Sequence, residues 1–166
     1  NTVETAYPFT DVYGIINEHI RSELPEGKTE KKVAVIGYDG CRADIVAEKQ
    51  DTGAINYLLN NGASINLTYC GGVNYPTGNG ITKTVEPKMF MTTLVEEGII
   101  DNAAFITKWK GHFTDSDSTY KDEKAYCEEN NIDIDFNLRK NKKDIHTGAM
   151  EEITSKDCAD FVFIIY

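Results

Sequence analysis

The sequence lacks a long apolar run, an excess of basic residues and paired cysteines. No stretch of the 166 residues approaches the roughly 20 consecutive apolar residues of a membrane-spanning helix, so no membrane span is expected. The formal net charge of -10 argues against a nucleic-acid backbone as partner, because such binding needs a basic face. The four cysteines form no C-x-x-C pair, which disfavours a zinc finger. We expect them to be free and near strand or helix ends, with two disulfides as the alternative in an oxidising compartment.

Common phosphate-binding motifs are also missing from the apolar segment and turn at residues 33–40, VAVIGYDG. The dinucleotide fingerprint G-x-G-x-x-G fails, because Gly37 and Gly40 have the wrong spacing and no third glycine follows. The P-loop pattern fails for lack of Gly-Lys-Ser/Thr. An aspartyl-phosphate loop of the D-x-D kind fails at Cys41. A different explanation is therefore needed for a strand that ends on an acidic residue and a glycine.

Apolar runs of strand length alternate with patterns of helical length along the chain. The expected strands are 33–38, 64–70, 103–109, 132–136 and 160–166. The expected helices are about 10–24, 52–62, 86–98, 118–130 and 150–157. This alternation predicts an α/β fold of three layers, with a mainly parallel sheet of about five strands and helices on both faces.

We expect one domain over residues 1–166, with 1–30 as a helical lead-in and 31–166 as the sheet core. The near-continuous apolar runs at 33–38 and 161–166 predict central strands. Ligands of such sheets bind at the carboxyl ends of the strands, and Asp39 follows one such end.

One motif does fit the first strand and its turn: D-G-x-R-x-D, which is Asp39-Gly40-Cys41-Arg42-Ala43-Asp44 in residues 39–44. This hexapeptide resembles the first motif of the alkaline phosphatase superfamily, in particular its type I phosphodiesterase and nucleotide pyrophosphatase-like branch. Further segments in the same order are similar to bacterial members over most of residues 33–166. These are GAINYLLNNGAS, TYCGGVNYP, GITKTVEPKMFMTTLVEEG and AAFITKWKGHF followed by STYKDEKAYCEEN.

The resemblance implies a metal-dependent phosphoric ester hydrolase that acts on a phosphate-ester small molecule. It implies that Asp39 is a ligand in a two-metal, usually zinc, site. Two close divalent cations can bridge a phosphoryl group, activate a Thr or Ser nucleophile and stabilise the leaving oxygen. The alternative is that Asp39 caps the following segment, and Arg42 and Asp44 are expected to form a local ion pair or cap. Family members are typically exported, which favours an extracytoplasmic location.

The sequence departs from the family pattern in two places. Family members carry a nucleophilic Thr or Ser near a T-x-P or T-A-P element, whereas here Pro76 passes directly to Thr77 in a glycine-rich segment. Thr77 is the candidate replacement nucleophile, and a plain turn is the simpler interpretation of PTGNG. In the family, Asp and His residues after the strand matching 160–166 complete both metal sites, and no such residues follow Tyr166 in this sequence. The sequence is thus similar to the N-terminal part of such a domain.

The three histidines are too few to rebuild the family's ligand set. His112 follows the predicted strand 103–109 and is the candidate for a role in a site. His19 is expected to pack on the apolar side of helix 10–24, and His146 is expected to be exposed to solvent.

Three functions are therefore in competition. The first is the hydrolase domain, inactive or incomplete as this chain. The second is a degenerate member of the superfamily that acts as a binding or structural module without catalysis. The third is a flavodoxin-like ligand-binding domain, disfavoured by the missing glycine loop. A terminal apolar strand at 160–166 is expected to need cover from a homo-oligomeric partner or a missing C-terminal portion.

Overall fold

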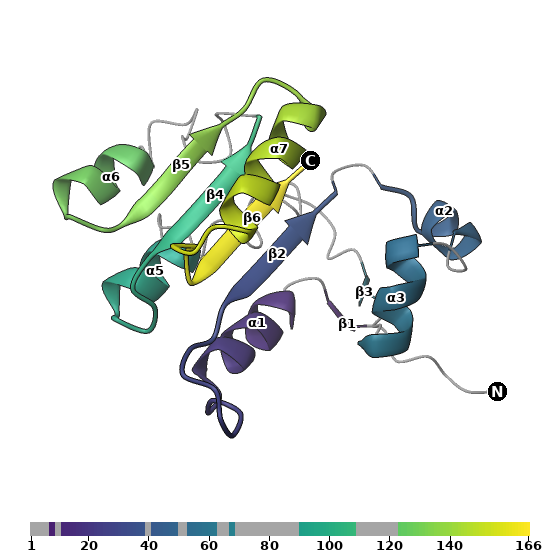
Figure 1. Ribbon diagram of the computed structural model, residues 1–166, viewed down its shortest axis with the longest axis horizontal. Helices are drawn as coiled ribbons and strands as arrows, with labels where there is room; N and C mark the ends of the chain where they lie inside the picture. The colour runs from purple at the N-terminus through teal and green to yellow at the C-terminus, as the bar shows by residue number, and fades with distance from the viewer. Residues whose placement is uncertain are drawn as a thin grey trace.

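The computed structural model of the protein describes residues 7–8, 11–38, 41–49, 53–62, 67–68, 90–108 and 123–166. In these ranges the main sheet has four strands, β2 (Val33–Gly37), β4 (Ala103–Thr107), β5 (Ile134–Leu138) and β6 (Phe161–Ile165). All of its neighbours pair in parallel, in the spatial order β2-β6-β4-β5 (Figure 1). The predicted α/β fold with a parallel sheet is confirmed, with four strands in place of about five. β1 (Tyr7–Pro8) and β3 (Leu67–Thr68) form a separate short parallel pair.

β6 is a central strand, as its sequence predicts. It lies between β2 and β4, and all five of its residues are buried. Because neighbouring strands cover both of its edges, β6 needs no partner copy or further segment to cover them. β2 is different: it lies at the edge of the sheet that the described residues form, and Ile36 is 52% exposed. The prediction of a central position for 33–38 is wrong for this sheet, because an apolar run does not by itself specify how many strands flank it.

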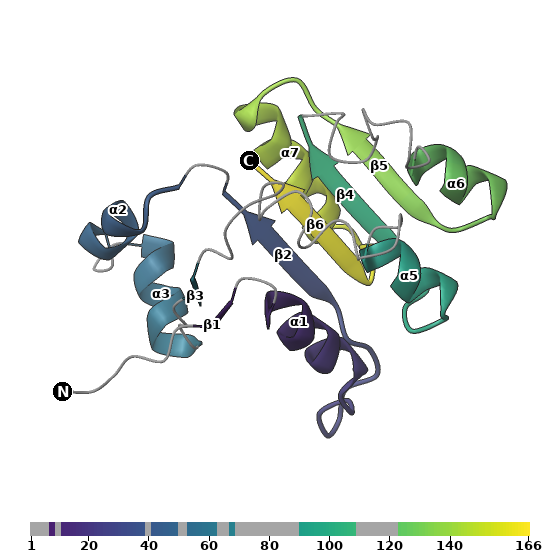
Figure 2. The same ribbon diagram turned by 180° about the vertical axis from the view of Figure 1, so that it is seen from behind.

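Helices cover both faces of the main sheet (Figures 1 and 2). The first face carries α1 (Asp11–Arg21), α5 (Phe90–Glu96) and α6 (Glu123–Glu129). Buried Met91 of α5 packs in one cluster with Phe105 and Phe163, whose rings stack with centroids 5.1 Å apart. Cys127 of α6 contacts Thr92 of α5, with Sγ and Oγ1 3.8 Å apart. This face therefore holds the aromatic half of the core.

The second face is covered by α7 (Lys142–Ile153). Ile145 and Ala149 of this helix pack with the alternate strand residues Ala104, Ile106, Val162 and Ile164. The sequence predicts a helix only over 150–157, so its first two turns are a finding of the structure. Asn141 begins the helix, because its side-chain oxygen accepts a bond from the Asp144 amide at 3.0 Å. The polar, lysine-rich sequence at the start of α7 has no apolar periodicity, so the sequence analysis did not extend the helix back to its Asn141 cap.

The position of His19 also corrects a prediction. Within α1, Ile16 and Ile20 lie four residues apart and pack against the core, whereas Ile15 is 49% exposed. His19 is exposed and lies off that narrow stripe, so the expectation that it packs is wrong. Its backbone carbonyl accepts a bond from Lys31 Nζ at 2.7 Å, which ties the end of the helix to the next segment.

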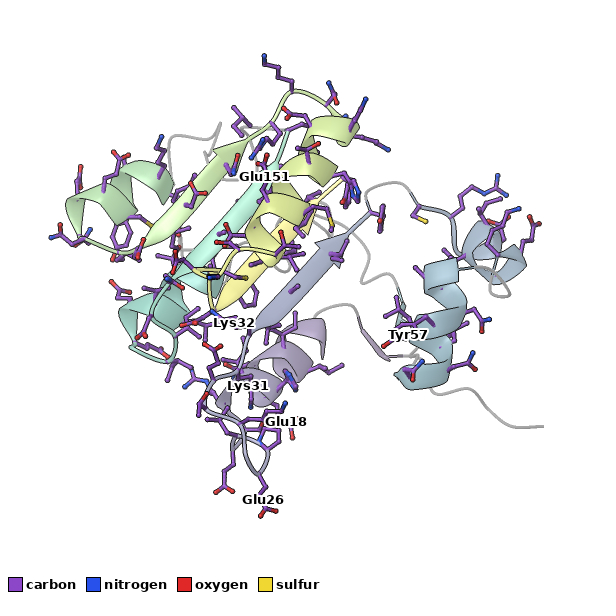
Figure 3. All side chains as sticks on the ribbon, viewed as in Figure 1. Glu18, Glu26, Lys31, Lys32, Tyr57 and Glu151 are labelled. Carbon is purple, nitrogen blue, oxygen red and sulfur yellow. The ribbon has the colours of Figure 1, made fainter. Side chains whose placement is uncertain are left out.

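Two helices lie to one side of the main sheet, beyond β2 (Figures 1 and 2). α3 (Gly53–Asn61) agrees with the predicted helix at 52–62, and α2 (Ala43–Glu48) was not predicted. Tyr57 of α3 is 67% exposed and is labelled in Figure 3. No helix in the described ranges has the length and apolar character needed to cross a membrane.

Candidate functional site

The carboxyl ends of β2 and β6 lie side by side, and this is where ligands of parallel sheets bind. Gly37 pairs with Ile165 as the last step of the ladder. The Tyr166 amide then donates to the Gly37 carbonyl at 3.0 Å, so the pairing continues past the strand. The segments that follow the two strands therefore begin next to each other.

Two tyrosines and a histidine meet at this edge. The rings of Tyr38 and Tyr166 stack with centroids 4.9 Å apart and planes 7° apart. Nδ1 of His146, in the second turn of α7, lies 3.2 Å from Tyr166 Oη. Burial raises the pKa of the Tyr166 phenol, and Tyr38 adds to the effect. His146 is exposed, which confirms the prediction.

Sequence reasoning missed the two tyrosines. The available signal was an aromatic residue directly after each of two apolar strands, at positions 38 and 166. That signal does not show that Tyr38 and Tyr166 contact each other, because their contact depends on β2 and β6 being neighbours in the sheet.

The candidate residues of the D-G-x-R-x-D motif are only partly described. Arg42 is 74% exposed and its guanidinium pairs with Asp44, donating from Nε to Oδ1 at 3.0 Å and from a terminal nitrogen to Oδ2. The hydrogen bond from Arg42 lowers the pKa of Asp44, and the Ile45 amide also contributes. The local ion pair expected for Arg42 and Asp44 is confirmed. Asp39 lies outside the described residues, as do Thr77 and His112.

The described residues do not form a metal site. Among them, no three His, Cys, Asp or Glu side chains are grouped so as to hold a metal ion. Cys41 is exposed, Cys158 is half-buried and Cys127 is buried, and all three are free thiols. Burial raises the pKa of the Cys127 thiol to about 11, which makes it a poor metal ligand and nucleophile at neutral pH.

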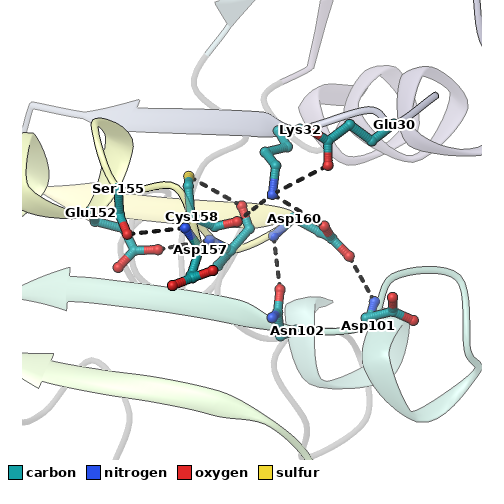
Figure 4. Close-up of polar contacts among 10 residues, drawn as sticks. Glu30, Lys32, Asp101, Asn102, Glu152, Ser155, Asp157, Cys158 and Asp160 are labelled. Atoms are coloured by element: carbon teal, nitrogen blue, oxygen red, sulfur yellow. Dashed lines mark hydrogen bonds and ion pairs between the residues drawn. The ribbon is translucent and has the colours of Figure 1, made fainter. Parts of the chain in front are cut away.

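The opposite, amino edge of the sheet is closed by a polar network (Figure 4). Asp160 accepts from the Asp101 amide at 2.9 Å, and its own amide donates to Asn102 Oδ1 at 2.9 Å. Lys32 Nζ lies 3.7 Å from a carboxylate oxygen of Asp160 and 3.7 Å from one of Glu30. These contacts tie the start of β6 to the segments that enter β2 and β4. This edge is a structural junction between the starts of β2, β4 and β6.

Comparison of the chain with protein-family models, with curated proteins and with solved structures gave no match in any of the three.

Proposed function

We propose that this chain is part of a metal-dependent phosphoric ester hydrolase domain of the alkaline phosphatase superfamily, and that the isolated 166 residues do not turn over substrate. The resemblance supplies the family, the zinc-type metal, the phosphate-ester substrate and the extracytoplasmic location. Asp39 is proposed as a metal ligand that follows β2. Thr77 as a replacement nucleophile and His112 as a further site residue belong to the same proposal.

The observation that supports this proposal is that β2 and β6 are parallel neighbours in register, and a non-catalytic member of the superfamily would share it. The family places its remaining metal ligands after the strand that matches residues 160–166, which contains β6. Residues joined to Tyr166 would therefore start beside the segment that contains Asp39, because Tyr38 and Tyr166 already stack. Adjacent strand ends can supply ligands to two metal ions that lie a few ångströms apart.

The described residues by themselves do not supply the ligands, since none of their acidic, His or Cys groups is clustered in threes. We therefore assign them no metal-assisted step. Their part is to hold the two strand ends together.

The alternative is a degenerate superfamily member that acts as a binding or structural module. It shares the sheet and the strand order with the hydrolase, and differs only in whether a cation binds next to Tyr38. The exposed ring of Tyr38, at 60%, would then be a contact surface.

Paramagnetic broadening by Mn²⁺ tests the proposal without needing catalysis. The ¹⁵N-labelled chain is titrated with Mn²⁺, and the amide signals of Tyr38 and Tyr166 are followed. Selective broadening of both is expected, and the variant Asp39→Asn should lose it. Asp44→Asn is the matched control, because it removes a neighbouring carboxylate that Arg42 already occupies.

Broadening that survives in Asp39→Asn, or that Asp44→Asn abolishes instead, would contradict a metal role for Asp39. No selective broadening at either tyrosine would favour the non-catalytic module.

A further inference from the structure

A separate concavity opens at the other end of the carboxyl edge, where β5 leads into α7. Its volume is about 660 Å³, and it is a shallow depression that is widely open to solvent. Its lining is mainly polar and charged, and comes from the end of β5 and the first two turns of α7; it includes Arg139, Lys140, Lys143 and Asp144. The Arg139 amide donates to the Thr107 carbonyl at 2.7 Å, so the ends of β4 and β5 are joined beside it.

The connections that leave β4 and β5 also indicate a binding crevice at this end of the sheet. After β4 the chain continues to α6 on the first face of the sheet, whereas after β5 it continues to α7 on the second face. Adjacent parallel strands whose outgoing connections go to opposite faces leave a crevice between their carboxyl ends. Open α/β sheets bind ligands at such switch points.

The charge of this region is opposite to that of the chain. The sequence carries a formal net charge of -10, yet four cations stand within residues 139–143: Arg139, Lys140, Lys142 and Lys143. In the part of the chain that the structure describes, the ammonium groups of Lys140 and Lys143 make no hydrogen bond or ion pair. A chain of negative net charge thus presents at one concavity two ammonium groups that make no hydrogen bond or ion pair in the described residues, and the charge of Lys140 also acts on the nearby Asp144 carboxylate.

The other charged groups of the concavity are already engaged. Arg139 donates from Nε to Asn137 at 2.7 Å and from its two terminal nitrogens to Asp144 and Glu151, at 3.4 Å and 3.0 Å. The Asp144 carboxylate also accepts from the Lys140 amide at 2.8 Å. The start of α7 is capped by Asn141, so the site does not depend on a bare helix end. The free positive charge therefore resides in the lysine side chains.

We propose that this concavity binds a phosphate-bearing small molecule, whose phosphate group lies between Lys140 and Lys143. A dianion is the group that two ammonium ions match in charge, and Asn137, whose Oδ1 accepts from Arg139, also lines the concavity. The site needs no metal ion and lies on the β4–β5 side of the sheet, away from the β2–β6 edge where Asp39 follows. It does not rest on the proposed hydrolase function.

Inorganic phosphate in the presence of EDTA is the probe. The ¹⁵N-labelled chain is titrated at pH 7.5 and constant ionic strength, and the amide shifts of residues 140–147 are followed. Saturable shifts are expected, and the double variant Lys140→Gln/Lys143→Gln should weaken the apparent affinity at least about fivefold. The matched control is Lys28→Gln/Lys156→Gln, which makes the same change in net charge with exposed lysines elsewhere. Circular dichroism checks that both variants are folded.

Saturable shifts that only the Lys140/Lys143 variant loses support the site. Two results would overturn it: no saturable shift in residues 140–147, or equal weakening in both double variants, which would mean that only the overall charge matters. Because EDTA removes divalent cations, this experiment and the Mn²⁺ titration can fail independently of each other.

Discussion

The guanidinium of Arg139 lies directly against Gly148: a Cβ built on Gly148 would sit 2.6 Å from Arg139 Nε. Arg139 is only 21% exposed, and it is held by Asn137, Asp144 and Glu151. A glycine in the middle of α7 therefore lets this side chain cross the helix surface. The contact fixes the end of β5 against α7. These two segments line the concavity that contains Lys140 and Lys143, here called the lysine concavity.

Replacing Gly148 by Ala is expected to lower the free energy of unfolding by about 1 kcal/mol, measured by urea titration. The added methyl group displaces the guanidinium, and the loss of its half-buried bonds outweighs the better helix propensity of alanine. In an Arg139→Ala background the same change should instead stabilise the protein by about 0.5–1 kcal/mol, because only the propensity effect is left.

Gly14→Ala in α1 is the matched control for this prediction. Nothing lies within 4 Å of a Cβ at that position, so a gain of about 0.5–1 kcal/mol is expected. A loss of equal size for Gly148→Ala with and without Arg139 would mean that the close approach is not the cause.

Removing the cap of α7 should also destabilise the fold. Asn141→Ala takes away the acceptor for the Asp144 amide, and a loss of about 1 kcal/mol in the free energy of unfolding is expected. Asn141→Asp keeps an acceptor and should cost much less. Thermal and urea unfolding of both variants measure the difference, and equal losses would argue against capping as the role of this side chain.

The thiol of Cys127 should resist alkylation in the folded protein. It is 2% exposed, and its burial raises the pKa from 9.0 to about 11. With iodoacetamide at pH 8.5 and mass spectrometry of each site, buried Cys127 should react at least about tenfold more slowly than exposed Cys41, since only the thiolate attacks. If Cys127 and Cys41 are alkylated at similar rates in native buffer, and urea does not change the ratio of the two rates, the buried position of Cys127 would be contradicted.

The same thiol makes stability depend on alkaline pH. A folded-state pKa above the unfolded value means that this contribution is complete below pH 9 and is lost as the pH rises towards about 11. Cys127→Ala removes the group, so its unfolding free energy should fall less steeply over that interval than that of the unchanged protein. Parallel slopes for the two proteins would show that the Cys127 thiol does not titrate differently on folding.

The isolated chain is expected to show no measurable zinc-dependent hydrolysis of p-nitrophenyl phosphate or of its diester. The reason is that the nucleophile element of the alkaline phosphatase superfamily does not occur in the sequence, and that no three His, Cys, Asp or Glu side chains of the described residues are grouped to hold a metal ion. Release of p-nitrophenol, with and without Zn²⁺, measures this. Clear turnover that Asp39→Ala abolishes would overturn the expectation and would identify Asp39 as essential in this chain.

Strands of the sheet could be predicted from the sequence where every residue of the strand is buried. The apolar runs that became β4 and β6 were identified from the sequence, and every residue of both strands is buried. β5 was placed two residues too early, at 132–136 in place of Ile134–Leu138. Its ends are set by register with β4, since Ala103 pairs with Ile134 and Thr107 with Leu138. A strand with alternating exposure carries too little local information to fix that register.

The candidate site was predictable only in part. The ion pair of Arg42 with Asp44 is local, and the motif spacing predicted it. The concavity lined by Lys140 and Lys143 was missed because the expected helix covered only 150–157, whereas the structure begins α7 at Lys142 and packs it on the sheet.

The sequence by itself determined that this protein has an α/β fold with a parallel sheet, because runs of apolar residues at strand and helix periods require burial in such layers. Only the tertiary structure decided the strand order. The insertion of β6 between β2 and β4 brings Tyr38 onto Tyr166, and the opposite crossings after β4 and β5 open the lysine concavity. These arrangements depend on packing between segments far apart in the chain, and local periodicity carries no record of which strands become neighbours.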